Sequence, residues 1–187
     1  MGFFNQKNPD RVFHEQGGAV RYELVIIRGA PGVGKTTLSE ALKRCFPGGV
    51  SIEIDHIRGM INSVAWIHAQ QDINSIEAAW AAGRSYLENG YRPLFLIDSF
   101  GILKYKRIIS MIHASRPELS CHTLALYCAD DELVSRIRSR KNGFSDIKNS
   151  LALNREVRDH RHRNETFIDT TGRSPESVLD EVLRILQ

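Results

Sequence analysis

The chain of 187 residues has the length of about one domain, with 42% hydrophobic and 25% charged residues. This composition excludes a collagen, a coiled coil and a wholly disordered chain, and no apolar run reaches the roughly 20 residues of a membrane-spanning helix. Residues 1–10 lack the apolar core of a secretory signal. The three cysteines form neither a disulfide framework nor a paired zinc motif, so we expect reduced thiols in a cytoplasmic protein.

Positive charge is concentrated in one part of the chain. The whole sequence has a formal net charge of +3, whereas residues 136–163 hold nine Lys or Arg against three acids, a net charge of +6. A local basic excess on a neutral background indicates that an anionic ligand meets the protein at one place. The alternative is a solvated helix face.

Short apolar runs alternate with helical patterns along the chain. We expect strands at residues 24–27, 50–54, 93–97, 123–128 and 166–169. We expect helices at residues 35–46, 102–114, 130–140 and 147–161, with two more between 57 and 89 that are broken near 72–74. A terminal helix is expected to begin at Pro175 and to carry Val178, Val182 and Ile185. This alternation predicts an α/β fold of three layers with a five-stranded parallel sheet. Residues 1–22 are expected to be an N-terminal extension, and residues 23–187 one domain with a helical lid within about 136–163.

Residues 29–36 match the phosphate-binding pattern G-x-x-x-x-G-K-[ST] at every fixed position, between an apolar strand and a helix. Glycines let the loop amides face phosphate oxygens at the positive end of the helix. We expect an exposed Lys35 that reaches the β and γ phosphates, and a Thr36 hydroxyl that binds Mg²⁺. The guanine-specific Asn-Lys-x-Asp motif is absent from the sequence. The expected nucleotide-binding residues of this loop are Gly29, Ala30, Pro31, Gly32, Val33, Gly34, Lys35, Thr36 and Thr37.

The second expected strand leads into three charged residues, Glu53, Asp55 and Arg58. Ligands of parallel α/β sheets bind beyond the carboxyl ends of the strands, so Asp55 is expected beside the phosphate loop. There a carboxylate can accept the proton of an attacking hydroxyl, and Arg58 can hold an anionic group of the acceptor. Glu53 is expected on the same side of the strand, within reach of a Mg²⁺-bound water. Asp55 can also cap the following helix, a role compatible with the first.

The phosphate loop followed by Glu53-x-Asp55-x-x-Arg58 resembles small P-loop kinases of the nucleoside-monophosphate-kinase fold. This group includes shikimate and gluconate kinases, antibiotic phosphotransferases and polynucleotide 5′-kinases, and the resemblance covers Leu24 to the C terminus. It implies transfer of the γ-phosphate of Mg²⁺-bound ATP to a hydroxyl of a small-molecule or nucleotide-like acceptor. It also implies that Asp55 binds or deprotonates this hydroxyl and that Arg58 contacts the substrate.

The resemblance extends to five later residues. Asp98 ends the third expected strand. This position resembles the Asp of a Walker B strand, which holds Mg²⁺ or its waters. In polynucleotide kinases an Asp at this position instead lies toward the acceptor. Arg136 and Arg140, four residues apart on one helix, resemble lid arginines that stabilise charge on the transferring phosphate. Arg173 and the preceding glycine, Gly172, follow the last strand and are expected beside the nucleotide base.

Two other functions remain open at this stage. One is a module that binds ATP as a switch with little turnover. The other is a nucleic-acid 5′-end kinase, which Arg58 and the basic segment favour but which lacks accompanying stacking aromatics. We rank the nucleic-acid acceptor below a small molecule, and we expect no membrane partner.

Overall fold

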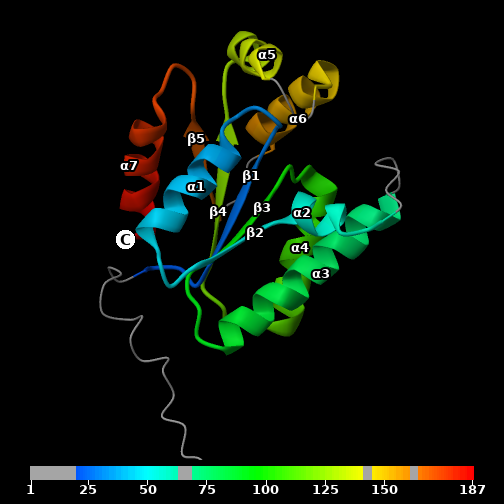
Figure 1. The fold of residues 1–187 in the computed structure, drawn as a ribbon, viewed down its shortest axis with the longest axis vertical. Coiled ribbons are helices and arrows are strands. Elements are labelled where there is room, and N and C mark those ends of the chain that lie inside the picture. The colour runs from blue at the N-terminus through cyan, green and yellow to red at the C-terminus, as the bar shows by residue number, and fades with distance from the viewer. Residues whose placement is uncertain (1–19, 63–68, 141–144, 161–163) are drawn as a thin grey trace, which may run out of the picture.

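The computed structural model describes residues 20–62, 69–140, 145–160 and 164–187, so the expected N-terminal extension lies almost wholly outside the described residues. Five strands form one sheet in the order β2-β3-β1-β4-β5, and every pair is parallel (Figure 1). The strands are β1 Leu24–Gly29, β2 Val50–Glu53, β3 Leu94–Asp98, β4 Cys121–Tyr127 and β5 Glu165–Asp169. The predicted parallel α/β fold is thereby confirmed.

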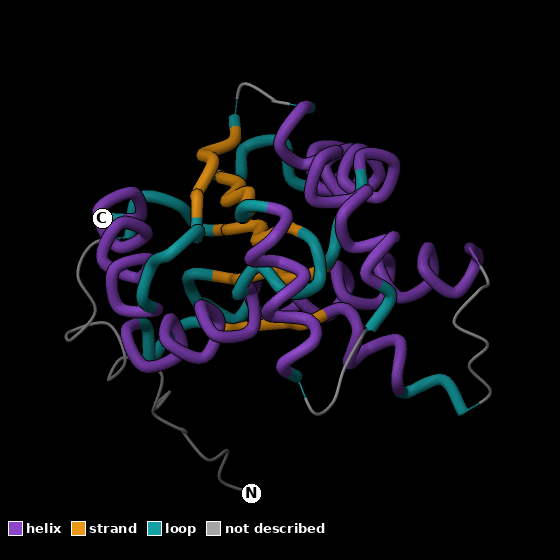
Figure 2. The backbone as a smooth tube through the Cα atoms, turned by 90° about the horizontal axis from the view of Figure 1, so that it is seen from above, coloured by secondary structure: helices purple, strands orange, loops and turns teal. Residues whose placement is uncertain are grey.

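Helices cover both faces of this sheet (Figures 1 and 2). One face carries α1 Lys35–Cys45 and α7 Pro175–Leu186, and the other carries α3 Ala69–Glu88 and α4 Ile102–Ser115. Beyond the carboxyl ends of the strands lie α2 Ile54–Gly59, α5 Asp130–Ser139 and α6 Ile147–Asp159. No helix in the described parts of the chain is both long and apolar enough to cross a bilayer.

The central strand β1 shows why its sequence is a continuous apolar run. Val25 and Ile27 belong to the apolar cluster under α1 and α7, whereas Leu24 and Ile26 belong to the cluster under α3 and α4. All four side chains are fully buried. A strand buried on both faces has no polar side, and this is what the sequence pattern indicates.

Two predicted boundaries between residues 50 and 89 are wrong. The second strand ends at Glu53 and α2 begins at Ile54, so Asp55 lies in the first turn of a helix and not at a strand end. The predicted break near residues 72–74 does not occur, because α3 runs from Ala69 to Glu88 without interruption. Polar residues there are accommodated by local contacts, as when Asn74 accepts a hydrogen bond from Gln70 at 2.9 Å.

A buried ion pair lies below the phosphate loop, and the sequence did not single it out. Arg28, the residue before Gly29, pairs with Glu165 of β5 at 2.9 Å, and neither side chain is exposed. The Arg28 guanidinium also donates to the carbonyl oxygens of Phe100 at 3.4 Å and His160 at 3.3 Å. A buried charge is tolerated only when it is paired and hydrogen-bonded, so these contacts fix the strand that enters the loop.

Gly29 itself has a φ of 151°, a conformation that residues with a side chain rarely adopt. A Cβ atom at this position would lie 2.4 Å from the carbonyl oxygen of Leu126 in β4. Backbone of a central strand cannot easily shift away, so the loop can leave the sheet here only through a glycine.

We expect Gly29→Ala to lower the free energy of unfolding by about 3 kcal/mol or more, through backbone strain plus the clash with β4. The matched control is Gly90→Ala, because Gly90 also has a positive φ of 90° but nothing within 4 Å of the added Cβ. This control should lose only about 1 kcal/mol from strain alone. Urea denaturation of both variants measures the difference, and equal losses would contradict the packing argument.

Candidate active site

The phosphate loop joins β1 to α1 in the strand-loop-helix arrangement that the sequence predicted. Gly29, Gly32 and Gly34 have positive φ angles, and Gly34 stands at the N-cap of α1 without a capping side chain. The first turn of α1 contains no acidic residue. The amides at the start of α1 are therefore available to bind an external anion. They lie at the positive end of the helix dipole, which favours such an anion.

Lys35 is not exposed in the loop, contrary to the prediction. Its ammonium donates hydrogen bonds to the carbonyl oxygens of Gly29 at 2.8 Å and Ala30 at 3.0 Å and to Ser99 Oγ at 3.1 Å. The side chain is half-buried. Burial lowers the pKa of Lys35 to about 8, although nearby Asp98 partly opposes this shift. A phosphate would have to replace the loop carbonyls as partner of this ammonium.

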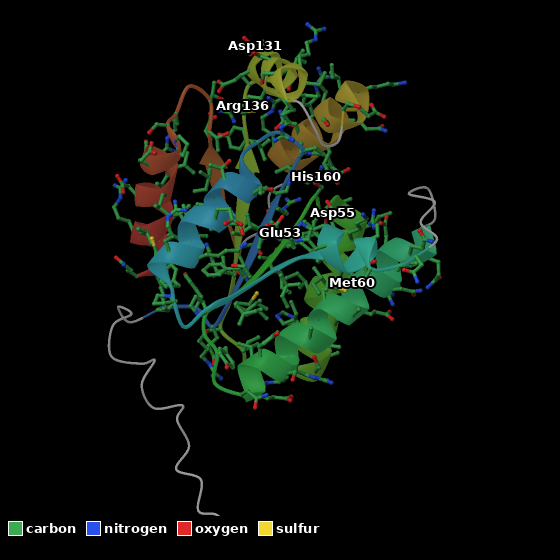
Figure 3. All side chains as sticks on the ribbon, in the orientation of Figure 1. Glu53, Asp55, Met60, Asp131, Arg136 and His160 are labelled. Carbon is green, nitrogen blue, oxygen red and sulfur yellow. The ribbon has the colours of Figure 1, made fainter. Side chains whose placement is uncertain are left out.

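One large cavity, of about 810 Å³, opens beside the phosphate loop. We call it the acceptor-side cavity, because it is lined by Asp55 and Arg58, which are expected to contact the acceptor. Its walls come from the loop, β2 and α2, the end of β3, the start of α4 and the beginning of α6. It brings together most of the predicted catalytic, metal and acceptor residues, namely Lys35, Thr36, Glu53, Asp55, Arg58, Asp98 and Arg140. Figure 3 labels Glu53 and Asp55 where β2 passes into α2.

Two carboxylates in this cavity have different surroundings. Asp98 is only 4% exposed, and its Oδ2 has no hydrogen-bond partner within the described part of the chain. Burial raises the pKa of Asp98, and the negative charge of Asp55 adds to the shift. Asp55, by contrast, is an exposed residue in the first turn of α2. One carboxylate therefore lies deep beside Lys35, and the other is open to a ligand.

The oxygen donors beside the loop fit Mg²⁺, which prefers hard oxygen ligands. They are the exposed hydroxyl of Thr36, the carboxylate of Glu53 and the unpartnered Oδ2 of Asp98. Over the described residues no three His, Cys, Asp or Glu form a metal site by themselves. A nucleotide-bound Mg²⁺ takes one or two carboxylates from the protein and its other ligands from phosphates and water.

A second cavity, of about 380 Å³, lies on the other side of the loop. Its walls include Thr37, Arg136, Thr170 and Arg173. We call it the base-side cavity, because Arg173 is expected beside the nucleotide base. Arg173 donates hydrogen bonds to the carbonyl oxygens of Ser177 at 2.6 Å and Asp169 at 3.1 Å. Gly172 does not line this cavity; its amide donates a hydrogen bond to Glu132 at 2.7 Å.

The structure separates the two arginines that the sequence placed together. Arg136 donates to Thr170 Oγ1 at 3.0 Å and to the Thr170 carbonyl at 2.7 Å and pairs with Glu132, so it lines only the base-side cavity. Figure 3 shows Arg136 at α5, well apart from Asp55 at α2. Helix α5 ends at Ser139, and Arg140 continues in extended backbone. Arg140 therefore leaves the helix face of Arg136 and lines both cavities.

Sequence reasoning missed Lys104, which lines the acceptor-side cavity from the first turn of α4. It also missed the partner of Arg58, since this buried arginine pairs with Asp72 of α3. The only available signal was that Lys104 follows the carboxyl end of β3 by six residues. Asp72 is fourteen residues from Arg58 and in another helix, so no local pattern connects them.

The basic segment is less positive in the fold than in the sequence. Arg155 pairs with Asp130 at 2.8 Å, Arg158 lies 3.9 Å from the same residue, and Arg136 pairs with Glu132. Both acids belong to the start of α5, immediately before the segment whose charge was counted. Three of the six Lys or Arg that the structure describes in this segment therefore pair with acids that precede it. Residues 141–144 and 161–163 of the expected lid lie outside the described residues.

Residues 25–159 match the family AAA_18, an AAA domain. None of the curated proteins is a significant match to the sequence. Solved structures with a similar fold include the tunicamycin resistance protein of Deinococcus radiodurans, with 20% identity, a TM-score of 0.64, and coverage of 88% of this chain and 95% of that chain.

Two further solved structures share the fold, one of a small-molecule kinase and one from an RNA repair complex. Shikimate kinase from Acinetobacter baumannii in complex with shikimate has 15% identity and a TM-score of 0.61, covering 88% of this chain and 93% of that chain. A chain of the Pnkp1/Rnl/Hen1 RNA repair complex has 19% identity and a TM-score of 0.59, covering 75% of this chain and 46% of that chain. Because the family match spans most of its length, the chain belongs to the AAA_18 family of AAA domains, and its fold is that of small P-loop kinases.

Proposed function

We propose that the protein is a Mg²⁺- and ATP-dependent kinase that transfers the γ-phosphate to a hydroxyl of a small-molecule acceptor. The observation that carries this proposal is the pair of cavities that meet at the phosphate loop. Gly32 and Arg140 line both of them. A protein that only binds or hydrolyses ATP needs one such space, whereas a kinase needs a second one for the acceptor. The carboxylates Asp55 and Asp98 line this second space.

In this proposal the loop amides and Lys35 bind the phosphates of ATP. The adenine ring of the nucleotide lies in the base-side cavity near Arg173. When Mg²⁺ is bound, it neutralises charge on the β and γ phosphates. Thr36 and Asp98 are the residues that would hold it, with Glu53 close to its waters. Arg136 donates hydrogen bonds to Thr170, and we assign it to the wall of the base-side cavity and not to the transferring phosphate.

Asp55 is the proposed general base. It is exposed at the acceptor-side cavity, whereas Asp98 is buried beside Lys35. The Asp55 carboxylate accepts the hydroxyl proton as the acceptor oxygen bonds to the γ phosphorus. The bond from this phosphorus to the bridging oxygen breaks at the same time, and ADP leaves with the electron pair. Arg140, at the junction of the two cavities, stabilises the charge on the phosphoryl group in transit.

A nucleic-acid acceptor is less well supported than a small molecule. No described residue that lines either cavity is Phe, Tyr or Trp, so the stacking surfaces typical of single-strand binding are missing there. Three arginines of the basic segment, Arg136, Arg155 and Arg158, are paired with Asp130 or Glu132 and are less available to a phosphate backbone. An ATP-dependent switch without turnover would leave the acceptor-side cavity and its carboxylates without a purpose.

The first test replaces the proposed base. Asp55→Asn should bind ATP as the wild type does but lower kcat by about 10²- to 10⁴-fold, because the amide cannot accept the proton. The matched control is Asp131→Asn, since Asp131 is also exposed and also the second residue of a helix, but lines neither cavity. ADP formation with an acceptor found by screening hydroxyl compounds measures both. A kcat for Asp55→Asn above about a tenth of the wild-type value would reject Asp55 as the base.

The second test separates the two arginines. Arg140→Ala should lower kcat by about 10²-fold or more with little change in ATP affinity, because its contact strengthens as charge develops. Arg136→Ala should instead raise the Kd for ATP by about tenfold, through loss of the cavity wall. Arg138→Ala is the control, since Arg138 is an exposed residue of the same helix that lines neither cavity. If Arg136→Ala reduced kcat as strongly as Arg140→Ala, the assignment of separate roles would be wrong.

The third test uses the lowered pKa of Lys35. With a pKa of about 8, this side chain is mostly charged at pH 7 and mostly neutral at pH 9 in the free protein. Because phosphates bind the charged form, the Kd for ATP should rise about tenfold between these two pH values. Lys35→Met should bind ATP more weakly and lose this pH dependence. Calorimetric titration at both pH values measures the ratio, and a flat wild-type profile would contradict the account of Lys35.

A further inference from the structure

Three charged residues from three helices meet at the wall of the acceptor-side cavity. The Lys104 ammonium of α4 lies 2.9 Å from Oδ2 of Asp72 in α3. The Arg58 guanidinium of α2 pairs with Oδ1 of the same carboxylate. Both cations line the cavity, whereas Asp72 does not. One carboxylate outside the cavity therefore holds two cations whose side chains face into it.

This arrangement is not explained by helix stability. Lys104 is in the first turn of α4, where the helix dipole favours anions and disfavours a cation. Burial lowers the pKa of Lys104, and the positive charge of Arg58 lowers it further, against the opposite effect of Asp98. A partly buried lysine, with 29% of its side chain exposed, is thus kept beside a second cation at an unfavourable end of a helix.

A second ion pair between the same two helices shows the contrast. Arg107 of α4 pairs with Glu77 of α3, and both side chains are about half exposed, at 46% and 48%. Neither residue lines the acceptor-side cavity. An exposed pair of this kind is enough to link two helices, at a gain of about 0–1 kcal/mol. The cluster of Arg58, Asp72 and Lys104 differs because both of its cations line a ligand cavity, whereas its carboxylate does not.

We propose that the acceptor carries an anionic group, a carboxylate or a phosphate, in addition to its hydroxyl, and that Lys104 binds this group together with Arg58. Asp72 is the counterion that keeps the two cations together until the anion arrives. The proposal rests on the proposed kinase function, because it concerns the same acceptor.

Two features of the cluster support this role. Arg58 and Lys104 pair with different oxygens of one carboxylate, so both cations can meet one small anion. An ammonium has three N–H donors, and across the described residues Asp72 is the one carboxylate within ion-pair distance of Lys104. The ammonium can therefore donate to a ligand in the cavity while it stays paired with Asp72.

The test loads the protein with Mg²⁺ and a non-hydrolysable ATP analogue, which fills the phosphate loop, and then titrates inorganic phosphate or, separately, acetate. We expect Lys104→Gln to weaken anion binding by about tenfold or more, through loss of a charged hydrogen bond. Lys104→Arg should retain binding, which excludes a folding defect. Asp72→Asn should tighten binding by about threefold or more, because it removes negative charge beside both cations. Glu77→Gln is the matched control and should bind as the wild type does.

A cluster with only a structural role would not make Lys104→Gln weaken anion binding while Asp72→Asn tightens it. Tighter binding of phosphate than of acetate indicates a phosphate-bearing acceptor, and the reverse indicates a carboxylic acid. The inference is overturned if neither anion binds the loaded wild type, if Lys104→Gln binds as tightly as the wild type, or if Asp72→Asn weakens binding. Failure of the ATP analogue to bind would instead contradict the proposed kinase function and remove the inference with it.

Discussion

The turn of the chain at Gly29 determines where the phosphate loop leaves the sheet. The close approach to the Leu126 carbonyl allows only glycine there, so β1 must leave the sheet at this residue and enter the phosphate loop. Just before it, the buried pair of Arg28 and Glu165 joins β1 to β5 and, through backbone carbonyls, to the loop after β3 and the end of α6. The phosphate site is thus fixed from below, and the two cavities open on either side of it.

The charges around this loop are arranged for ligands that the protein itself does not supply. Lys35 is held by carbonyl oxygens, which are weaker partners for an ammonium than phosphate. The buried Asp98 has an unpartnered oxygen among the described residues, and burial raises its pKa. Lys104 and Arg58 both pair with the carboxylate of Asp72. Each of these groups would gain a better partner from a metal-bound triphosphate and an anionic acceptor.

Sequence reasoning succeeded where one local pattern determines one local structure. The phosphate loop could be predicted because its glycines, Lys35 and Thr36 form a contiguous motif between a strand and a helix. The parallel sheet followed from the alternation of apolar runs with helical patterns. The separation of Arg136 from Arg140 could not be predicted, because the four-residue spacing holds only while the helix continues, and α5 ends at Ser139. Contacts between helices, such as Arg58 with Asp72, leave no periodic trace in the sequence.

The central claim is that phosphate passes directly from the nucleotide to an acceptor held in the acceptor-side cavity. Its most direct test is to incubate the protein with Mg²⁺, ATP carrying an isotope-labelled γ-phosphate and a mixture of small hydroxyl compounds, and to locate the label by mass spectrometry. The account predicts a labelled phosphate ester of a compound that also carries a carboxylate or phosphate, formed in equal amount to ADP. Label found only in free inorganic phosphate, or no consumption of ATP at all, would contradict it.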